Sequence, residues 1–145
     1  AGYGARLGGW LIDWVILVVV GLIVNAPLHQ LKNNTTVSNG TTMHRLHLGL
    51  GGIVIDALII IVYGGLLCGS SRGQTVGMMA VGTRAVRVDG GGPIGYGRAF
   101  GRAAFEYLMA VLLILPWVID MLFPLWDAQN QTLHDKVAST VVVKT

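Results

Sequence analysis

The sequence has few charged residues. Asp, Glu, Lys and Arg together make up 12% of its 145 residues, whereas an ordinary soluble domain carries about 25%. So few charges cannot cover a water-exposed surface, which argues against a soluble enzyme domain. The 53% share of hydrophobic residues argues equally against a disordered chain. The class that remains is an integral membrane protein.

Cysteine and catalytic motifs are also scarce. Cys68 is the single cysteine, so an intrachain disulfide is excluded. His134 and Asp135 are residue types that could act together as a general base, but no Ser or Cys nucleophile motif accompanies them. No cluster of basic residues is interleaved with aromatic ones, which argues against nucleic-acid binding. We therefore expect neither enzymatic activity nor a cofactor.

Two long apolar runs predict membrane spans. Residues 7–26 are apolar apart from Asp13, and such a helix is long enough to cross about 30 Å of hydrocarbon. Pro27 is expected to end this helix. Residues 48–68 form the second run, with Asp56 as their only charge. The polar residues 28–47 between the runs are expected to form an extracytoplasmic loop.

The second half of the chain repeats features of the first. GYGARLGGWLIDW from Gly2 resembles GYGRAFGRAAFEY from Gly95, and QTVGMMAVGTRAVR from Gln74 resembles QTLHDKVASTVVVK from Gln131. These matches predict one domain, residues 1–145, that contains two copies of a unit, residues 2–88 and 95–144. Each copy would consist of a helical hairpin, a Gln-Thr box and a strand.

The second hairpin is expected to be short or re-entrant. Its first helical run, residues 98–115, breaks at Pro116. The following residues 117–126 would cover only about 15 Å as a helix. The predicted fold class is thus an all-α membrane protein with two helical hairpins. Residues 84–88 and 140–144 would pair into a small cytoplasmic β-hairpin-like element.

The basic residues indicate the orientation in the membrane. Cytoplasmic loops carry an excess of Lys and Arg. A four-pass arrangement leaves only Lys32 and Arg45 on the opposite side. We therefore expect a multi-pass plasma-membrane protein with both termini in the cytoplasm. The bases on that side would be Arg6, Arg72, Arg84, Arg87, Arg98, Arg102, Lys136 and Lys144.

Four carboxylates lie in apolar stretches: Asp13, Asp56, Glu106 and Asp120. A carboxylate in lipid is costly unless it is paired or neutral, so each position suggests a role. One interpretation is proton or cation binding between facing carboxylates. The other is structural pairing, in particular between Arg102 and Glu106, which are one helical turn apart.

Three histidines fall in the polar loop: His29, His44 and His47. His44 and His47 are three residues apart, a spacing that can place two imidazoles on one helical face. No Cys or acidic residue lies nearby to complete a metal site. The sequence therefore predicts no metal centre, and His29, His44 and His47 stand only as an alternative.

Three short motifs resemble the RDD family of bacterial membrane proteins, which is named for one Arg and two Asp. Arg6 and Asp13 lie in RLGGWLIDW, and Asp135 lies in QTLHDKVASTVVV. The middle segment GQTVGMMAVGTRAVRVDGGGP is also similar to that family. The polar loop is longer than in the family, and DAQNQ from Asp127 stands where basic residues often precede the last box.

The resemblance implies two functions. Some members are reported as monovalent cation/proton antiporters, and others accompany larger membrane systems. The chain is short for a transport path, and its glycine-rich helix faces suit tight packing. We therefore expect an accessory or scaffolding subunit whose partners are the lipid bilayer and other membrane proteins. The alternative is an oligomeric antiporter with Asp13 and Asp56 as its exchange site.

Overall fold

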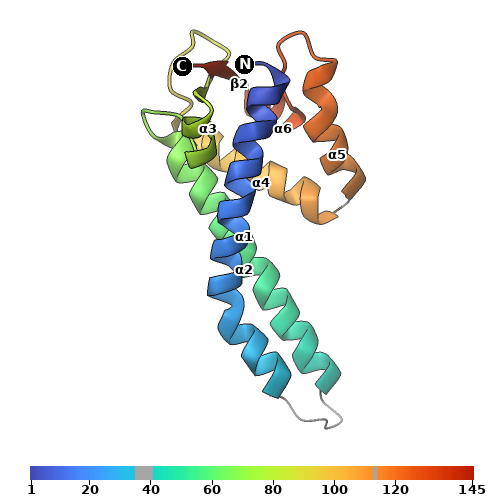
Figure 1. The fold of residues 1–145 in the computed structure, drawn as a ribbon. Coiled ribbons are helices and arrows are strands. Elements are labelled where there is room, and N and C mark those ends of the chain that lie inside the picture. The colour runs from blue at the N-terminus through green and yellow to red at the C-terminus, as the bar shows by residue number, and fades with distance from the viewer. Residues whose placement is uncertain (35–40, 113) are drawn as a thin grey trace.

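The computed structural model describes residues 1–34, 41–112 and 114–145, and the side chains of residues 28–49 and 114 lie outside this description. Two long helices dominate it: α1 (Tyr3–Asn34) and α2 (Thr41–Gly69). They run side by side and extend away from the rest of the molecule (Figure 1). The described chain has two helices that are long and apolar enough to span a membrane, over Tyr3–Pro27 and Leu50–Gly69.

The predicted polar loop is mostly helical, which corrects the sequence-based boundaries. Helix α1 continues through Pro27 to Asn34, and α2 already begins at Thr41. A proline inside a helix removes a single backbone hydrogen bond, to the carbonyl four residues earlier. Helices in membrane proteins tolerate this loss better than helices in water do. The prediction that Pro27 ends the helix was therefore wrong.

The remaining elements gather around one end of the α1–α2 pair (Figure 1). In chain order they are α3 (Val76–Ala80), β1 (Thr83–Arg87), α4 (Gly95–Leu112), α5 (Ile114–Leu122), the 3-10 helix η1 (Phe123–Leu125), α6 (Leu133–Val137) and β2 (Thr140–Lys144). Pro116 lies in the first turn of α5 and does not break it, because the first N–H groups of a helix have no intrahelical acceptor.

Strands β1 and β2 form a two-stranded antiparallel sheet, in which Thr83 pairs with Lys144 and Arg87 with Thr140. The predicted pairing of these two segments is confirmed, with β1 beginning one residue earlier than expected. The strands are far apart in the chain, so their pairing depends on the tertiary structure and not on a tight turn. It fastens the last residues of the chain to its middle.

The two Gln-Thr segments make the same local contacts. The Gln74 side-chain amide donates to the Thr83 carbonyl at 2.8 Å, and Gln131 donates to Thr140 at 2.7 Å. The hydroxyls of Thr75 and Thr132 cap α3 and α6 respectively. The local similarity in sequence therefore corresponds to a similarity in structure.

Turn geometry repeats at the same offset. Gly73 and Asn130 precede the two boxes with φ angles of 64° and 52°, and Gly82 and Ser139 precede the two strands with φ angles of 64° and 53°. Asn and Ser adopt this left-handed conformation less readily than Gly does. The wider division of the chain into two hairpin copies stays a prediction.

Helices α2 and α4 pack closely because small residues of α2 face α4. A Cβ atom on Gly65 would lie 2.4 Å from the Phe100 ring, and one on Gly69 would lie 2.5 Å from the Tyr96 ring. Neither position has room for a side chain, as expected for close-packed membrane helices.

The described interior is more polar than the described exterior. Ten polar or charged residues are buried against seven hydrophobic ones, while large apolar residues such as Leu22 and Ile23 are 64% and 68% exposed. A helix that is apolar on its outer face suits a lipid environment. The buried polar groups concentrate where α4, α5, α6 and the sheet meet, which directs attention to that region.

Candidate functional site

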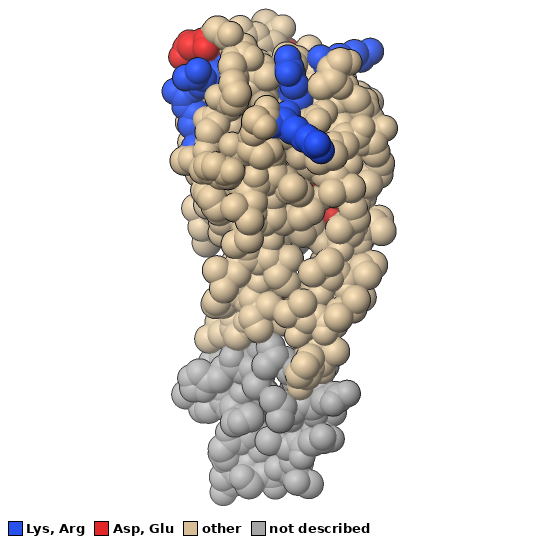
Figure 2. Space-filling model, turned by 90° about the vertical axis from the view of Figure 1, so that its left-hand side faces the viewer, with Lys and Arg blue, Asp and Glu red and all other residues tan. Residues whose placement is uncertain are grey.

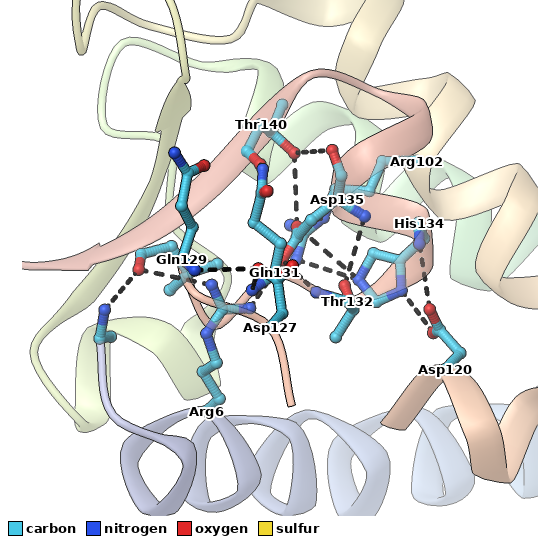
Figure 3. Close-up of polar contacts among 12 residues, drawn as sticks. Arg6, Arg102, Asp120, Asp127, Gln129, Gln131, Thr132, His134, Asp135 and Thr140 are labelled. Carbon is cyan, nitrogen blue, oxygen red and sulfur yellow. Dashed lines mark hydrogen bonds and ion pairs between the residues drawn. The ribbon is translucent and has the colours of Figure 1, made fainter. Parts of the chain in front are cut away.

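Asp135 lies at the centre of the polar interior and is fully buried. Two arginines from different helices contact it: Arg6 Nη1 lies 2.6 Å from Oδ2, and Arg102 Nε lies 2.8 Å from Oδ1 (Figure 3). The Thr140 hydroxyl also donates to Oδ1 at 3.3 Å. One carboxylate thus joins α1, α4, α6 and β2.

Local sequence positions Asp135. It is the third residue of α6, and its side chain accepts a hydrogen bond from the Thr132 backbone N–H at 3.3 Å. The Thr132 hydroxyl in turn accepts from the Asp135 N–H, which completes a capping box. The same carboxylate therefore both caps the N-terminus of α6 and pairs with the two arginines.

Asp120 and His134 extend the cluster. Asp120, on α5, accepts from the His134 backbone N–H at 3.0 Å and lies 2.6 Å from the imidazole Nδ1. The other ring nitrogen, Nε2, lies 3.2 Å from Arg102 Nη2. A neutral imidazole satisfies both contacts if Nδ1–H donates to Asp120 and Nε2 accepts from Arg102.

We call Arg6, Arg102, Asp120, His134 and Asp135 the charge network. With a neutral imidazole, its two guanidinium groups balance its two carboxylates. Buried ions are tolerated when they are paired and hydrogen-bonded in this way. The network therefore joins α1, α4, α5 and α6 without leaving a net charge in the interior.

Burial and ion pairing act in opposite directions on the acid–base behaviour of the network. Burial alone raises the pKa of Asp135, but the guanidinium groups of Arg102 and Arg6 and the nearby His134 hold it well below its usual range. Burial alone lowers the pKa of His134, yet the hydrogen bond to Asp120 and the charge of Glu106 make the net shift upward. Nδ1 donates to Asp120 in either protonation state of the imidazole.

The lowered pKa of Asp135 predicts a loss of stability in acid. The folded pKa is below the ordinary value of 3.8, so this group stabilises the fold above that pH and loses its contribution as the pH falls through the folded pKa. We expect the apparent unfolding temperature in detergent to drop as the pH falls below 3.8. An Asp135→Asn variant should show a shallower acid slope, and equal slopes would contradict this role.

Asp13 lies outside the charge network and is saturated with neutral donors. Its carboxylate accepts from the Tyr63 hydroxyl at 2.6 Å, from the Gly77 N–H at 2.7 Å and from the Thr75 hydroxyl. These contacts tie α1 to α2 and to the N-terminus of α3. Asp13 thereby contacts the start of α3 as Asp120 contacts the start of α6.

Asp56 makes a separate contact in the apolar part of the helix pair. It accepts from the Asn25 side-chain amide at 2.8 Å, and Asn25 also donates to the Gly21 carbonyl at 2.9 Å. Asn25 is twelve residues beyond Asp13 on α1, which corresponds to about 18 Å along the helix axis. The structure thus does not bring Asp13 and Asp56 together as the predicted exchange site requires.

Glu106 lies on α4 and lines a cavity instead of pairing with Arg102. The predicted Arg102–Glu106 ion pair was wrong, because Arg102 is used by Asp135. The charged group of Arg102 gains more from a fully buried carboxylate than from a partly exposed residue on its own helix.

Comparison with known proteins identifies the family. The model of the RDD family matches residues 1–139. The chain belongs to the RDD family. In this RDD protein the residues of the recognised motifs separate into two contacts: Arg6 with Asp135, and Asp13 with the start of α3.

The curated relatives are mycobacterial proteins. The chain is 35% identical over 71 residues to a proline-rich antigen homolog of Mycobacterium tuberculosis, covering 49% of this RDD protein and 28% of that one. It is 41% identical over 73 residues to the proline-rich antigen of Mycobacterium leprae, covering 50% and 26%. The match therefore spans only about a quarter of the length of these relatives. No solved structure matches it.

Other site predictions have different outcomes. The side chains of His29, His44 and His47 lie outside the described residues, and no group of three or more metal-binding side chains occurs within the part of the RDD chain that is described. Asp120, one of the four carboxylates in apolar stretches, is fully buried. The sequence did not indicate the contacts of Arg102 with Asp135 or of His134 with Asp120. The Thr-x-x-Asp spacing that ends at Asp135 was the available signal.

Proposed function

We propose that this chain is an accessory or scaffolding unit of a larger bacterial membrane complex, with no catalytic role. The observation that carries the proposal is that its acids serve the fold: Asp13, Asp120 and Asp135 each accept hydrogen bonds from other elements. Its long helices meanwhile present apolar side chains outward. That pattern suits a rigid membrane module whose lipid-facing surface contacts other helices.

The lengths of the relatives support the same proposal. The matched segment, about half of this chain, corresponds to 26–28% of the mycobacterial proteins. A unit that recurs as one part of longer proteins behaves as a module, and the larger context carries the specific activity.

We further propose that both termini face the cytoplasm. Basic side chains gather at the end of the molecule that carries the sheet and both termini, and the described face of the long helices below shows none (Figure 2). The exposed bases of this end are Arg72, Arg84, Arg87, Lys136 and Lys144. This asymmetry matches the positive-inside tendency. Helix α5, about 13 Å long, would then belong to a re-entrant hairpin.

A reporter fusion tests the orientation. A cytoplasm-active reporter joined after Thr145 should be active, and a periplasm-active reporter at the same position should be silent. The opposite pattern would rule out the proposed topology. The same fusions in an Asp135→Asn background show whether the network is required for this orientation.

Site-specific photocrosslinking tests the scaffold proposal. We expect a photoreactive residue at Ile23 of α1 or Leu58 of α2, which are 68% and 58% exposed, to form one discrete adduct with the same membrane protein. The matched control is Ala99, which is 1% exposed and should form no intermolecular adduct. Adducts with lipid alone at both exposed positions would refute a scaffolding role.

The Asn25–Asp56 contact favours the second candidate function, cation/proton antiport by an oligomer. An ionisable residue inside a spanning segment often marks an ion path. Asn25 Oδ1 is buried and has no hydrogen-bond partner among the described residues. Sodium- or potassium-driven pH changes in vesicles test this function, with Asp56→Asn expected to abolish them. Absence of flux in the unsubstituted protein would exclude it.

A further inference from the structure

A cavity of about 300 Å³ lies between α1, α2, α4 and α5, at the end of the α1–α2 pair around which the other elements gather. Its lining includes Trp10 and Asp13 from α1, Tyr63 from α2, Glu106 from α4 and Trp117 from α5. This volume is at the lower end of the range for small-molecule sites in proteins. The cavity borders the charge network but takes its walls mainly from other residues.

Aromatic rings form much of the wall. The ring centres of Trp10 and Trp117 are 5.4 Å apart, and those of Trp10 and Trp14 are 6.4 Å apart. Tyr63 and Tyr107 also contribute to the lining. The faces of such rings attract organic cations, and indole attracts them most strongly.

The charges beside the cavity do not balance. Arg6, Arg102 and His134 also line the cavity, and Asp135 together with Asp120 balances the two guanidinium groups. Asp13 has only neutral donors, and Glu106 forms no ion pair or hydrogen bond with any described residue. With a neutral His134, the groups around the cavity therefore carry an excess of negative charge, which favours an added cation.

The chemistry of the wall selects among cations. A metal ion such as Ca²⁺ or Mg²⁺ requires several oxygen ligands. The oxygens of Asp13 already accept hydrogen bonds, which leaves the Glu106 carboxylate among aromatic, aliphatic and basic side chains. A quaternary ammonium group has no N–H to satisfy, and it gains from aromatic faces and one nearby negative charge.

We propose that this cavity binds a small organic cation of the quaternary ammonium class, with its charge beside Glu106 and its alkyl groups against Trp10 and Trp117. This site is independent of the scaffolding role, since it concerns the interior of the molecule and not its lipid-facing surface. The cation could be a free solute or the headgroup of a choline lipid, because both present the same trimethylammonium group.

Tryptophan fluorescence tests the proposal in the purified full chain. Trp126 is 73% exposed and is first replaced, Trp126→Phe, so that emission comes from Trp10, Trp14 and Trp117. The probes are choline and the larger benzyltrimethylammonium. The control is 3,3-dimethylbutan-1-ol, in which a carbon atom replaces the nitrogen of choline. We expect a saturable change with the two cations and at least about tenfold weaker binding of the neutral isostere.

Substitutions locate the site. Glu106→Gln keeps the shape of the side chain and should weaken binding of benzyltrimethylammonium about tenfold. Asp89→Asn removes an exposed carboxylate that does not line the cavity and should leave binding unchanged. Trp117→Leu keeps every charge and should also weaken binding, which covers the case that Glu106→Gln does not fold.

Several outcomes would overturn the proposal: no saturable change, equal binding of the neutral isostere, unchanged affinity in folded Glu106→Gln, or displacement of the probe by equimolar sodium or potassium. Nanodiscs separate the two sources of the cation. Weaker probe binding in phosphatidylcholine than in phosphatidylethanolamine, which has the same net charge, identifies the lipid headgroup as occupant, and equal binding identifies a free solute. Either result supports a cation site.

Discussion

Replacing Asp135 by Asn should lower the free energy of unfolding by about 3–5 kcal/mol, the cost of removing one partner from a buried ion pair. The carboxylate contacts Arg6 at 2.6 Å and Arg102 at 2.8 Å, and all three side chains are at least nine-tenths buried. Asparagine cannot neutralise either guanidinium group. The variant would leave both guanidinium groups in the interior without the carboxylate that pairs with them.

Thermal unfolding in detergent measures this effect. We expect the apparent midpoint of Asp135→Asn to fall by about 10 °C or more, whereas Asp89→Asn, at an exposed turn position, should stay near the parent value. A second substitution, Arg6→Met, should be less harmful in the Asp135→Asn background than alone, because the two residues are coupled. Additive effects of the two changes would show that the pair contributes little.

Replacing Gly77 by Ala should be nearly as harmful, by about 3 kcal/mol. A Cβ atom on Gly77 would lie 2.0 Å from the Gly9 carbonyl oxygen and 2.8 Å from the Asp13 carboxyl carbon. The first of these atoms belongs to the backbone of α1 and cannot rotate away. Helix α3 would have to move from α1, and the 2.7 Å bond from the Gly77 N–H to Asp13 would be lost.

Gly101→Ala is the matched control. Gly101 lies inside α4, and a Cβ atom there meets nothing within 4 Å. Alanine favours helix by up to about 1 kcal/mol over glycine, so this variant should be neutral or slightly more stable. Unfolding temperatures of the two variants, measured under one condition, decide the matter. Equal destabilisation would show that general helix effects, and not the clash at α3, control the result.

The features that sequence predicts well are those encoded locally. Two apolar runs without compensating charge define the spans, because a run of about twenty apolar residues is stable mainly in lipid. The strand pairing was also predictable, since TRAVR from Thr83 and TVVVK from Thr140 follow matching Gln-Thr boxes. Composition and short repeats are sufficient to predict such elements.

The features that sequence predicts poorly depend on distant contacts. The spacing of Arg102 and Glu106 indicated a pair on one helix, yet such pairs contribute only about 0.2–0.5 kcal/mol and yield to a buried partner. Asp120 gave no local sign of its contact with His134, because α5 reaches α6 only in the folded molecule. Pro27 wrongly indicated the end of a helix, because the effect of proline on a helix depends on the surrounding medium.

The separation of Arg6 and Asp135 in the sequence determines when their contact can form during synthesis. The two residues are 129 positions apart, and at 5–20 residues per second a ribosome needs roughly 6–26 s to add that stretch. Helices α1 and α2 can enter the bilayer long before Asp135 is made. During this interval Arg6 lacks its carboxylate partner. The contact that joins α1 to the C-terminal segment can therefore form only after nearly the whole chain has been made.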